Sequence, residues 1–160
     1  MENINLKPKN SIENKLPSNI EAEQALIGSI LVNNDIIDEI SNLLKAEKFF
    51  DPVHKKIFKV IESLNNKGMI ANPITLKNYF ENLNELDEVG GAEYLVKLTR
   101  FASSSKQATD YAKIVHENFV KRELLEISNV ISEDSLDIDL DKSSENIIED
   151  AEKSLFDLAE

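Results

Sequence analysis

The sequence contains no cysteine, which excludes disulfide bonds, zinc–thiolate sites and thiol nucleophiles. It has only four glycines and four prolines in 160 residues, so long uninterrupted helices are possible. No apolar run reaches the length of about 18 residues that a membrane-spanning helix needs, and residues 1–16 lack the apolar core of a signal peptide. We therefore expect a soluble, cytoplasmic protein with no membrane partner.

Negative charge is in excess, and it is concentrated toward one end of the chain. The net charge is −12, and residues 132–160 hold eleven acidic residues against two lysines. Residues 1–131 are closer to balance, with nineteen acidic and sixteen basic residues. Because an acidic segment repels phosphate backbones, we expect no strong direct binding to nucleic acid. Two basic clusters, within residues 45–59 and 97–122, are interpreted as solvated helix faces.

Apolar residues recur at helical spacing through residues 17–102, which predicts a compact globular bundle of short helices. Ser18 and Glu21 have the spacing of a capping box at the start of the first helix. Residues 1–16 show little periodicity and are expected to form a disordered arm.

Other helix ends are marked by local signals. Asp51 followed by Pro52 predicts a helix start, because Asp caps free amides and Pro fits the first turn. Gly68 predicts the end of that helix, and Thr75 is expected to cap the next.

Residues 106–160 have a different pattern, which predicts a helical hairpin. One long helix is expected over about 107–131 and a last one over about 144–159, joined by a polar loop. No segment alternates with a period of two, so no sheet is expected. The predicted fold is all-α, a compact helical bundle followed by an antiparallel two-helix hairpin.

The long helix has apolar residues over more of its circumference than one partner helix can cover. The surplus would face the bundle or another molecule, and we expect intermolecular contact. The residues predicted to form this self-association surface are Tyr111, Ile114, Val115, Phe119, Leu125, Ile148, Ala151, Leu155 and Leu158.

A search for catalytic, cofactor-binding and metal-binding residues identifies none. The glycines do not have the spacing of a phosphate-binding loop, and no Gly-Lys pair occurs. His54 and His116 have no second histidine or carboxylate pair at i, i+4 that would make a metal site. Acidic residues near helix starts, such as Glu21 and Glu23, are explained by the helix dipole.

Six segments resemble, in order, the N-terminal domain of the bacterial replicative DNA helicase DnaB. Residues 17–31 match the pattern P-x-N-x-E-A-E-x-x-L-x-G-x-x-L, and residues 49–58 match F-x-x-x-x-H-x-x-I-F. Residues 86–95 match L-x-x-V-G-G-x-x-Y-L. Weaker matches cover residues 68–76, 111–115 and 151–156. The loop of residues 101–106 departs from the family, since it is Ser-rich where an Asn and often a Pro are expected.

The resemblance implies a collar domain of a helicase, and not a complete enzyme. In that family hairpins of two subunits pair, and six such domains form a ring on the hexamer. The ring serves as a platform for DnaG-type primase and, in some bacteria, for a helicase loader. ATP and Mg²⁺ are expected only in a motor domain, which this sequence lacks.

Two other function classes remain as alternatives. A free-standing helical adaptor unrelated to replication would share the fold but not these partners. A metal-dependent or acid–base hydrolase on a helical bundle is the third class.

Overall fold

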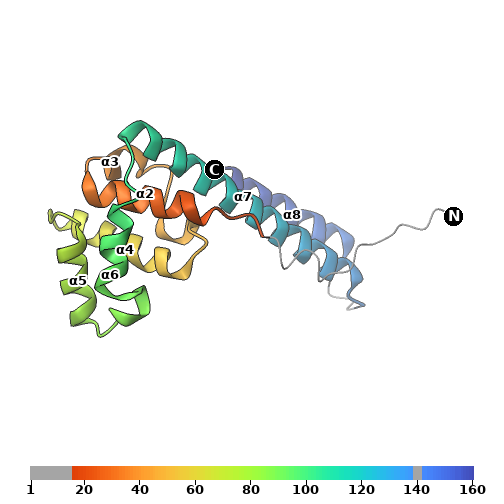
Figure 1. Ribbon diagram of the computed structural model, residues 1–160. Coiled ribbons are helices and arrows are strands. Elements are labelled where there is room, and N and C mark those ends of the chain that lie inside the picture. The colour runs from red at the N-terminus through yellow and green to blue at the C-terminus, as the bar shows by residue number, and fades with distance from the viewer. Residues whose placement is uncertain (1–15, 139–141) are drawn as a thin grey trace. The chain divides into compact units, whose positions relative to one another are not determined.

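The computed structural model describes residues 16–138 and 142–160, so the expected disordered arm lies almost entirely outside the described residues. Figure 1 shows that these residues form helices, and none of them forms a strand. The predicted all-α fold is thus confirmed. In chain order the elements are α2 Ile20–Val32, α3 Ile36–Ile40, η1 Ala46–Lys48, α4 Pro52–Asn66, α5 Pro73–Asn82, η2 Asp87–Val89, α6 Gly91–Thr99, α7 Ser105–Leu136 and α8 Ser144–Ala159.

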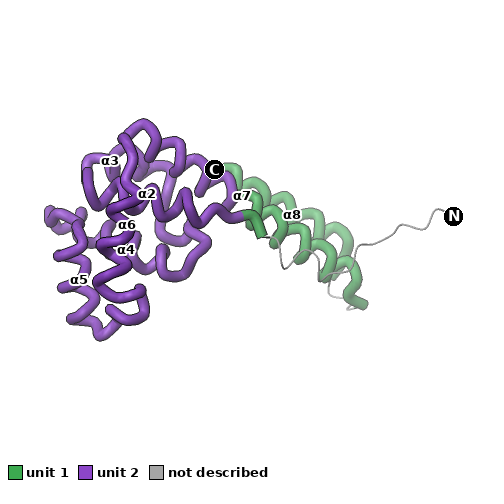
Figure 2. Tube along the Cα trace, in the orientation of Figure 1, with its two compact units in different colours: residues 1–17, 120–160 green, residues 18–119 purple. Residues whose placement is uncertain are grey.

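The chain divides into two compact units, and the division falls inside α7 (Figure 2). Unit 2 is Ser18–Phe119, and unit 1 contains Met1–Pro17 and Val120–Glu160. The sequence predicted a boundary between residues 102 and 106. The structure differs because Ala108, Ala112 and Val115, in the first half of α7, are buried in the core of unit 2.

The start and end of α4 agree with the sequence prediction. The Asp51 side chain accepts a hydrogen bond from Val53 N at 2.8 Å, and Pro52 occupies the first helical position. Gly68, at φ 71°, follows the last turn in the left-handed conformation that glycine tolerates.

Two predicted caps were wrong by one or a few residues. Asn19, and not Ser18, caps α2 by accepting from Ala22 N at 2.9 Å. Asn72, and not Thr75, caps α5; the Thr75 hydroxyl instead accepts from Asn72 N at 3.0 Å, which completes a reciprocal capping box. In each case a neighbouring side chain of similar capping ability has the extended backbone that the cap position requires.

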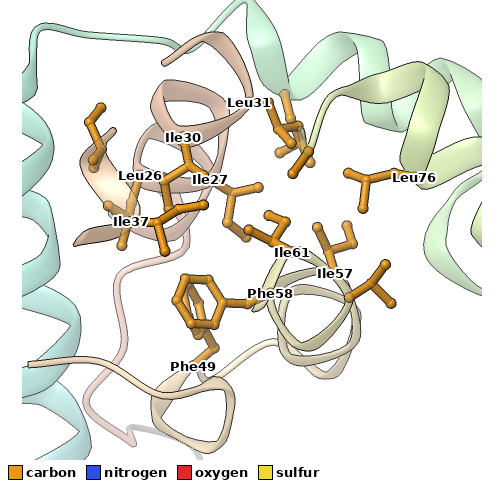
Figure 3. Close-up of a cluster of buried hydrophobic side chains, with 14 of the residues drawn as sticks. Leu26, Ile27, Ile30, Leu31, Ile37, Phe49, Ile57, Phe58, Ile61 and Leu76 are labelled. Carbon is orange, nitrogen blue, oxygen red and sulfur yellow. The ribbon is translucent and has the colours of Figure 1, made fainter. Parts of the chain in front are cut away.

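The core of unit 2 is built around α2 and α4. Both helices contribute faces that are almost inaccessible to solvent (Figure 3). The ring centres of Phe49 and Phe58 lie 4.8 Å apart, with the ring planes tilted by 40°. Residues labelled in Figure 3 include Leu26, Ile27, Ile30, Ile57 and Ile61. A Cβ added at Gly28 would lie 2.0 Å from the carbonyl oxygen of Leu98, so glycine allows α2 and α6 to approach closely.

A buried carboxylate connects α2 to the start of α4. Glu23 is 2% exposed, and its oxygens accept hydrogen bonds from Phe50 N at 2.7 Å and Asp51 N at 3.2 Å. His54 Nδ1 lies 2.9 Å from Glu23 Oε1. Glu23 therefore fixes the residues that begin α4.

The same histidine connects α4 to α6. His54 Nε2 lies 2.6 Å from the Tyr94 hydroxyl, which also accepts from Gln24 Nε2 at 3.3 Å. Burial raises the pKa of the Tyr94 phenol, so its proton remains available. One arrangement satisfies every group: Tyr94 donates to Nε2, and Nδ1 donates to Glu23.

Replacing Tyr94 by Phe should lower the free energy of unfolding by about 1–3 kcal/mol, because it leaves a buried ring nitrogen of His54 without a partner. Denaturant unfolding followed by far-ultraviolet circular dichroism measures this loss. Tyr79→Phe is the matched control, since Tyr79 is also half-buried against the core but has no recorded hydroxyl partner among the described residues. Equal stability of the two variants would refute the structural role of the network.

Candidate protein–protein interface

The second half of α7 and α8 form a helical hairpin within unit 1 (Figure 2). Lys142 Nζ lies 2.6 Å from Asp134 Oδ1, which ties the start of α8 to the end of α7. The hydrogen bond to Asp134 raises the pKa of Lys142, so the ammonium stays charged. At the other end of this part of α7, Arg122 donates to the carbonyl oxygen of Pro17 at 2.6 Å.

The side chains of α8 that are partly covered are Ile147, Ala151 and Leu158. Their spacing places them on one face of the helix. Ala151 and Leu158 were predicted to lie on the self-association surface, whereas the structure places them on this face, which is partly covered within the chain. Ile148 is 57% exposed and is not on this covered face; Ile147 takes its place. Leu155, at 44% exposed, lies at its border.

The hairpin exposes several large apolar side chains to solvent. Among the described residues 142–160, α8 has no fully buried side chain. Exposed apolar residues on the two hairpin helices are Leu124, Val130, Leu136, Ile148, Leu155 and Phe156. Four of them, Leu124, Val130, Leu136 and Phe156, were absent from the predicted surface. Their residue types show that they are apolar, and their spacing shows on which face of the helix they lie. Neither shows which face of the helix contacts the other helix of the hairpin.

The part of the predicted surface on the first half of α7 is largely internal to unit 2. Val115 is 1% exposed and belongs to the core, so its assignment to an external surface was wrong. Tyr111 packs against the same core, whereas Ile114 is exposed. Leu125, in unit 1, is half-buried. The bundle thus covers much of the apolar surplus that the sequence suggested was free.

Phe119 also has a partner within unit 2. Lys48 Nζ lies 5.8 Å from the centre of its ring, within the range of a cation–π contact. Lys48 also donates to the carbonyl oxygen of Leu43 and lies 3.3 Å from His116 Nδ1. Burial, and secondarily the charge of Lys48, lowers the pKa of His116, which favours a neutral ring that accepts from the ammonium.

The structure also locates the residues that sequence reasoning examined for chemistry. Glu23 and His54 form the buried network described above, and Glu21 is exposed. Within residues 16–138 and 142–160, no three His, Cys, Asp or Glu side chains gather in a group that could hold a metal ion. None of the helices described has the length and apolarity needed to cross a membrane.

The chain is similar in sequence to replicative helicases. It is 40% identical over 144 residues to the replicative DNA helicase DnaB of Rickettsia felis, and 41% identical over 144 residues to that of Rickettsia bellii. Each match covers 90% of this chain and 29% of the relative. The chain therefore spans about three tenths of the length of the curated relatives that it matches.

Two solved structures are similar in fold. The crystal structure of the N-terminal domain of DnaB helicase from Mycobacterium tuberculosis has a TM-score of 0.80 at 24% identity, over 90% of this chain and 99% of that one. A structure of a DnaB-like replicative helicase and its interactions with primase has a TM-score of 0.71 at 26% identity, over 88% of this chain and 31% of that one.

The family model described as DnaB-like helicase N terminal domain matches residues 15–117, which is more than half of the chain. The matched segment includes α2 through α6 and the part of α7 that is buried in unit 2. The chain belongs to the family of DnaB-like helicase N-terminal domains.

Proposed function

We propose that this chain is the assembly and docking domain of a replicative DNA helicase, and that it does not itself hydrolyse ATP or unwind DNA. The observation that carries the proposal is the hairpin of unit 1, whose helices expose large apolar side chains and leave α8 without a fully buried residue. Membership of the helicase N-terminal domain family supports a role in replication. ATP and Mg²⁺ would be bound by the motor domain of the whole helicase.

In this proposal two hairpins pair about a two-fold axis. A symmetric contact buries the same patch on both copies, so Ile148 and Leu155 would become buried on each of the two copies. Burial of apolar surface contributes about 25 cal/mol for each Å² removed from water. Three such pairs would make the hexamer of the full-length protein.

The partner proposed for the assembled domain is a DnaG-type primase. One of the similar structures is that of a DnaB-like replicative helicase and its interactions with primase, and the match to it covers 88% of this chain. This similarity supports a primase-docking role for the domain. A helicase loader is a further proposed partner. The competing reading, an adaptor unrelated to replication, has no support from the relatives, which are replicative helicases.

Replacing Leu155 by Glu should weaken dimerisation at least tenfold. Loss of a buried leucine contact forfeits about 1.5–3 kcal/mol, and 1.4 kcal/mol corresponds to a factor of ten. Sedimentation equilibrium measures the effect, and circular dichroism should show that helicity is retained. Asn129→Glu is the control, because it adds the same charge at an exposed position of the hairpin.

Dimerisation of the unchanged protein should also strengthen as salt rises, because salt screens repulsion between two acidic segments. A wild-type chain that stays monomeric at high protein and salt concentration would contradict hairpin pairing. So would a Leu155→Glu variant that unfolds, since that would place the leucine in an internal core.

The folded chain should bind a purified DnaG-type primase without ATP. Binding is expected because the domain, and not the motor, provides the docking surface in this proposal. Titration calorimetry with the wild-type chain and with Leu155→Glu would show whether docking requires the dimer. If primase binds neither protein at any accessible concentration, the docking role is wrong and the adaptor alternative gains.

A further inference from the structure

An open groove of about 530 Å³ lies on unit 2 between η1 and α4. Its lining includes three exposed lysines, Lys45, Lys55 and Lys59, together with Lys56, Ala46 and the acidic Glu47 and Glu62. Lys55 and Lys59 are one helical turn apart on α4 and therefore lie on the same side of that helix. The sequence suggested only that these lysines form a solvated face, whereas the structure places them around a common concave surface.

These three lysines differ from Lys56 in forming no ion pair with another residue that the structure describes. Lys56 pairs with Glu88 and lies 3.9 Å from Glu85, which raises the pKa of its ammonium. For Lys45, Lys55 and Lys59, no side-chain hydrogen bond or ion pair is recorded with any residue of 16–138 or 142–160. All three are exposed. The groove lining thus has four lysines against two glutamates, which leaves an excess of positive charge.

A complementary surface occurs on α8 of unit 1. Glu145, Glu149 and Glu152 follow one another at i, i+4 and i+7, so they form a stripe along one face. All three are exposed, and Phe156, 64% exposed, continues the stripe by one turn. This face points away from the residues Ile147, Ala151 and Leu158 that are partly covered.

We propose that the lysine groove of one copy binds the acidic face of α8 from a second copy of this chain. Lys55 and Lys59 have the same one-turn spacing as Glu145 and Glu149, about 6 Å along a helix. The Phe156 ring would lie on Ala46 and on the aliphatic parts of the lysine side chains, which remain apolar although their ends are charged.

Local fit decides between this occupant and a nucleic acid. The chain has a net charge of −12, and residues 132–160 contain eleven acidic residues against two lysines. This overall charge opposes the approach of any polyanion, a second copy included, so the choice depends on how the negative groups are spaced. The acidic helix of another copy supplies carboxylates in a fixed register together with an aromatic ring.

The groove and the acidic face are different surfaces, so their contact is heterologous and can link more than two copies. Combined with a two-fold hairpin contact, it would generate assemblies larger than a dimer. That consequence rests on the proposed function. The groove contact itself does not, because it uses neither Ile148 nor Leu155.

A charge-swap experiment tests the contact. One variant carries Lys55→Glu and Lys59→Glu, and the other carries Glu149→Lys and Glu152→Lys, both in the Leu155→Glu background that removes hairpin pairing. Each alone should associate about tenfold more weakly than the Leu155→Glu parent at low salt, since like charges then face each other. Mixing the two should restore association, because the reversed groove now meets a reversed helix. Analytical ultracentrifugation of each sample and of the mixture measures the result.

The control is Lys97→Glu with Lys106→Glu, an equal change in charge at exposed positions of unit 2 outside the groove. Circular dichroism establishes that every variant remains helical. The proposal is overturned if the groove variant associates like this control, or if the mixture does not associate more than either component. It is also overturned if replacing the groove lysines weakens binding of a single-stranded oligonucleotide but leaves association between copies unchanged. The hypothesis of hairpin pairing is tested separately, by the effect of Leu155→Glu alone on dimerisation. Failure of the groove contact can therefore be distinguished from failure of hairpin pairing.

Discussion

A carboxylate removed from water needs donors for its lone pairs, and Glu23 obtains them from the residues that begin α4 and from His54. Because His54 also contacts Tyr94, three helices far apart in sequence are held by one chain of hydrogen bonds. Leaving a buried polar group without its partner costs about 1–3 kcal/mol, and more when the group is charged. The orientation of α4, and with it the position of the groove lysines on its outer face, therefore depends on a residue of α2.

Local sequence signals predicted several helix ends well. They did not predict the buried hydrogen-bond network of Glu23, His54 and Tyr94. Asp51 and Pro52 act on amides within one turn, so their effect can be read from neighbouring residues. His54 lies only two residues after Pro52, yet its partners are 31 and 40 residues away. A histidine next to two lysines resembles a solvated residue until the fold brings a carboxylate and a phenol to it. The caps at Asn19 and Asn72 show the remaining local ambiguity, because Ser18 and Thr75 could cap as well.

The long helix α7 illustrates why the candidate surface was only partly predictable. Its apolar residues extend around much of its circumference, which indicates more than one partner but does not identify them. The structure assigns Ala108, Ala112 and Val115 to the core of unit 2, and the second half of the helix to the hairpin. Periodicity gives the face on which a side chain lies, whereas the identity of its neighbour is set by contacts between distant segments.

The two units differ in how they obtain stability, and this difference bears on assembly. Unit 2 has a core of large, fully buried side chains and a buried polar network with satisfied partners. The hairpin has no fully buried residue on α8, although ordering each residue costs about 1–2 kcal/mol in backbone entropy. Helix formation offsets part of that cost, and apolar contact with another copy would offset more. In the proposed dimer, association would stabilise the helices of the hairpin, and these helices would hold the acidic face of α8 in a fixed register.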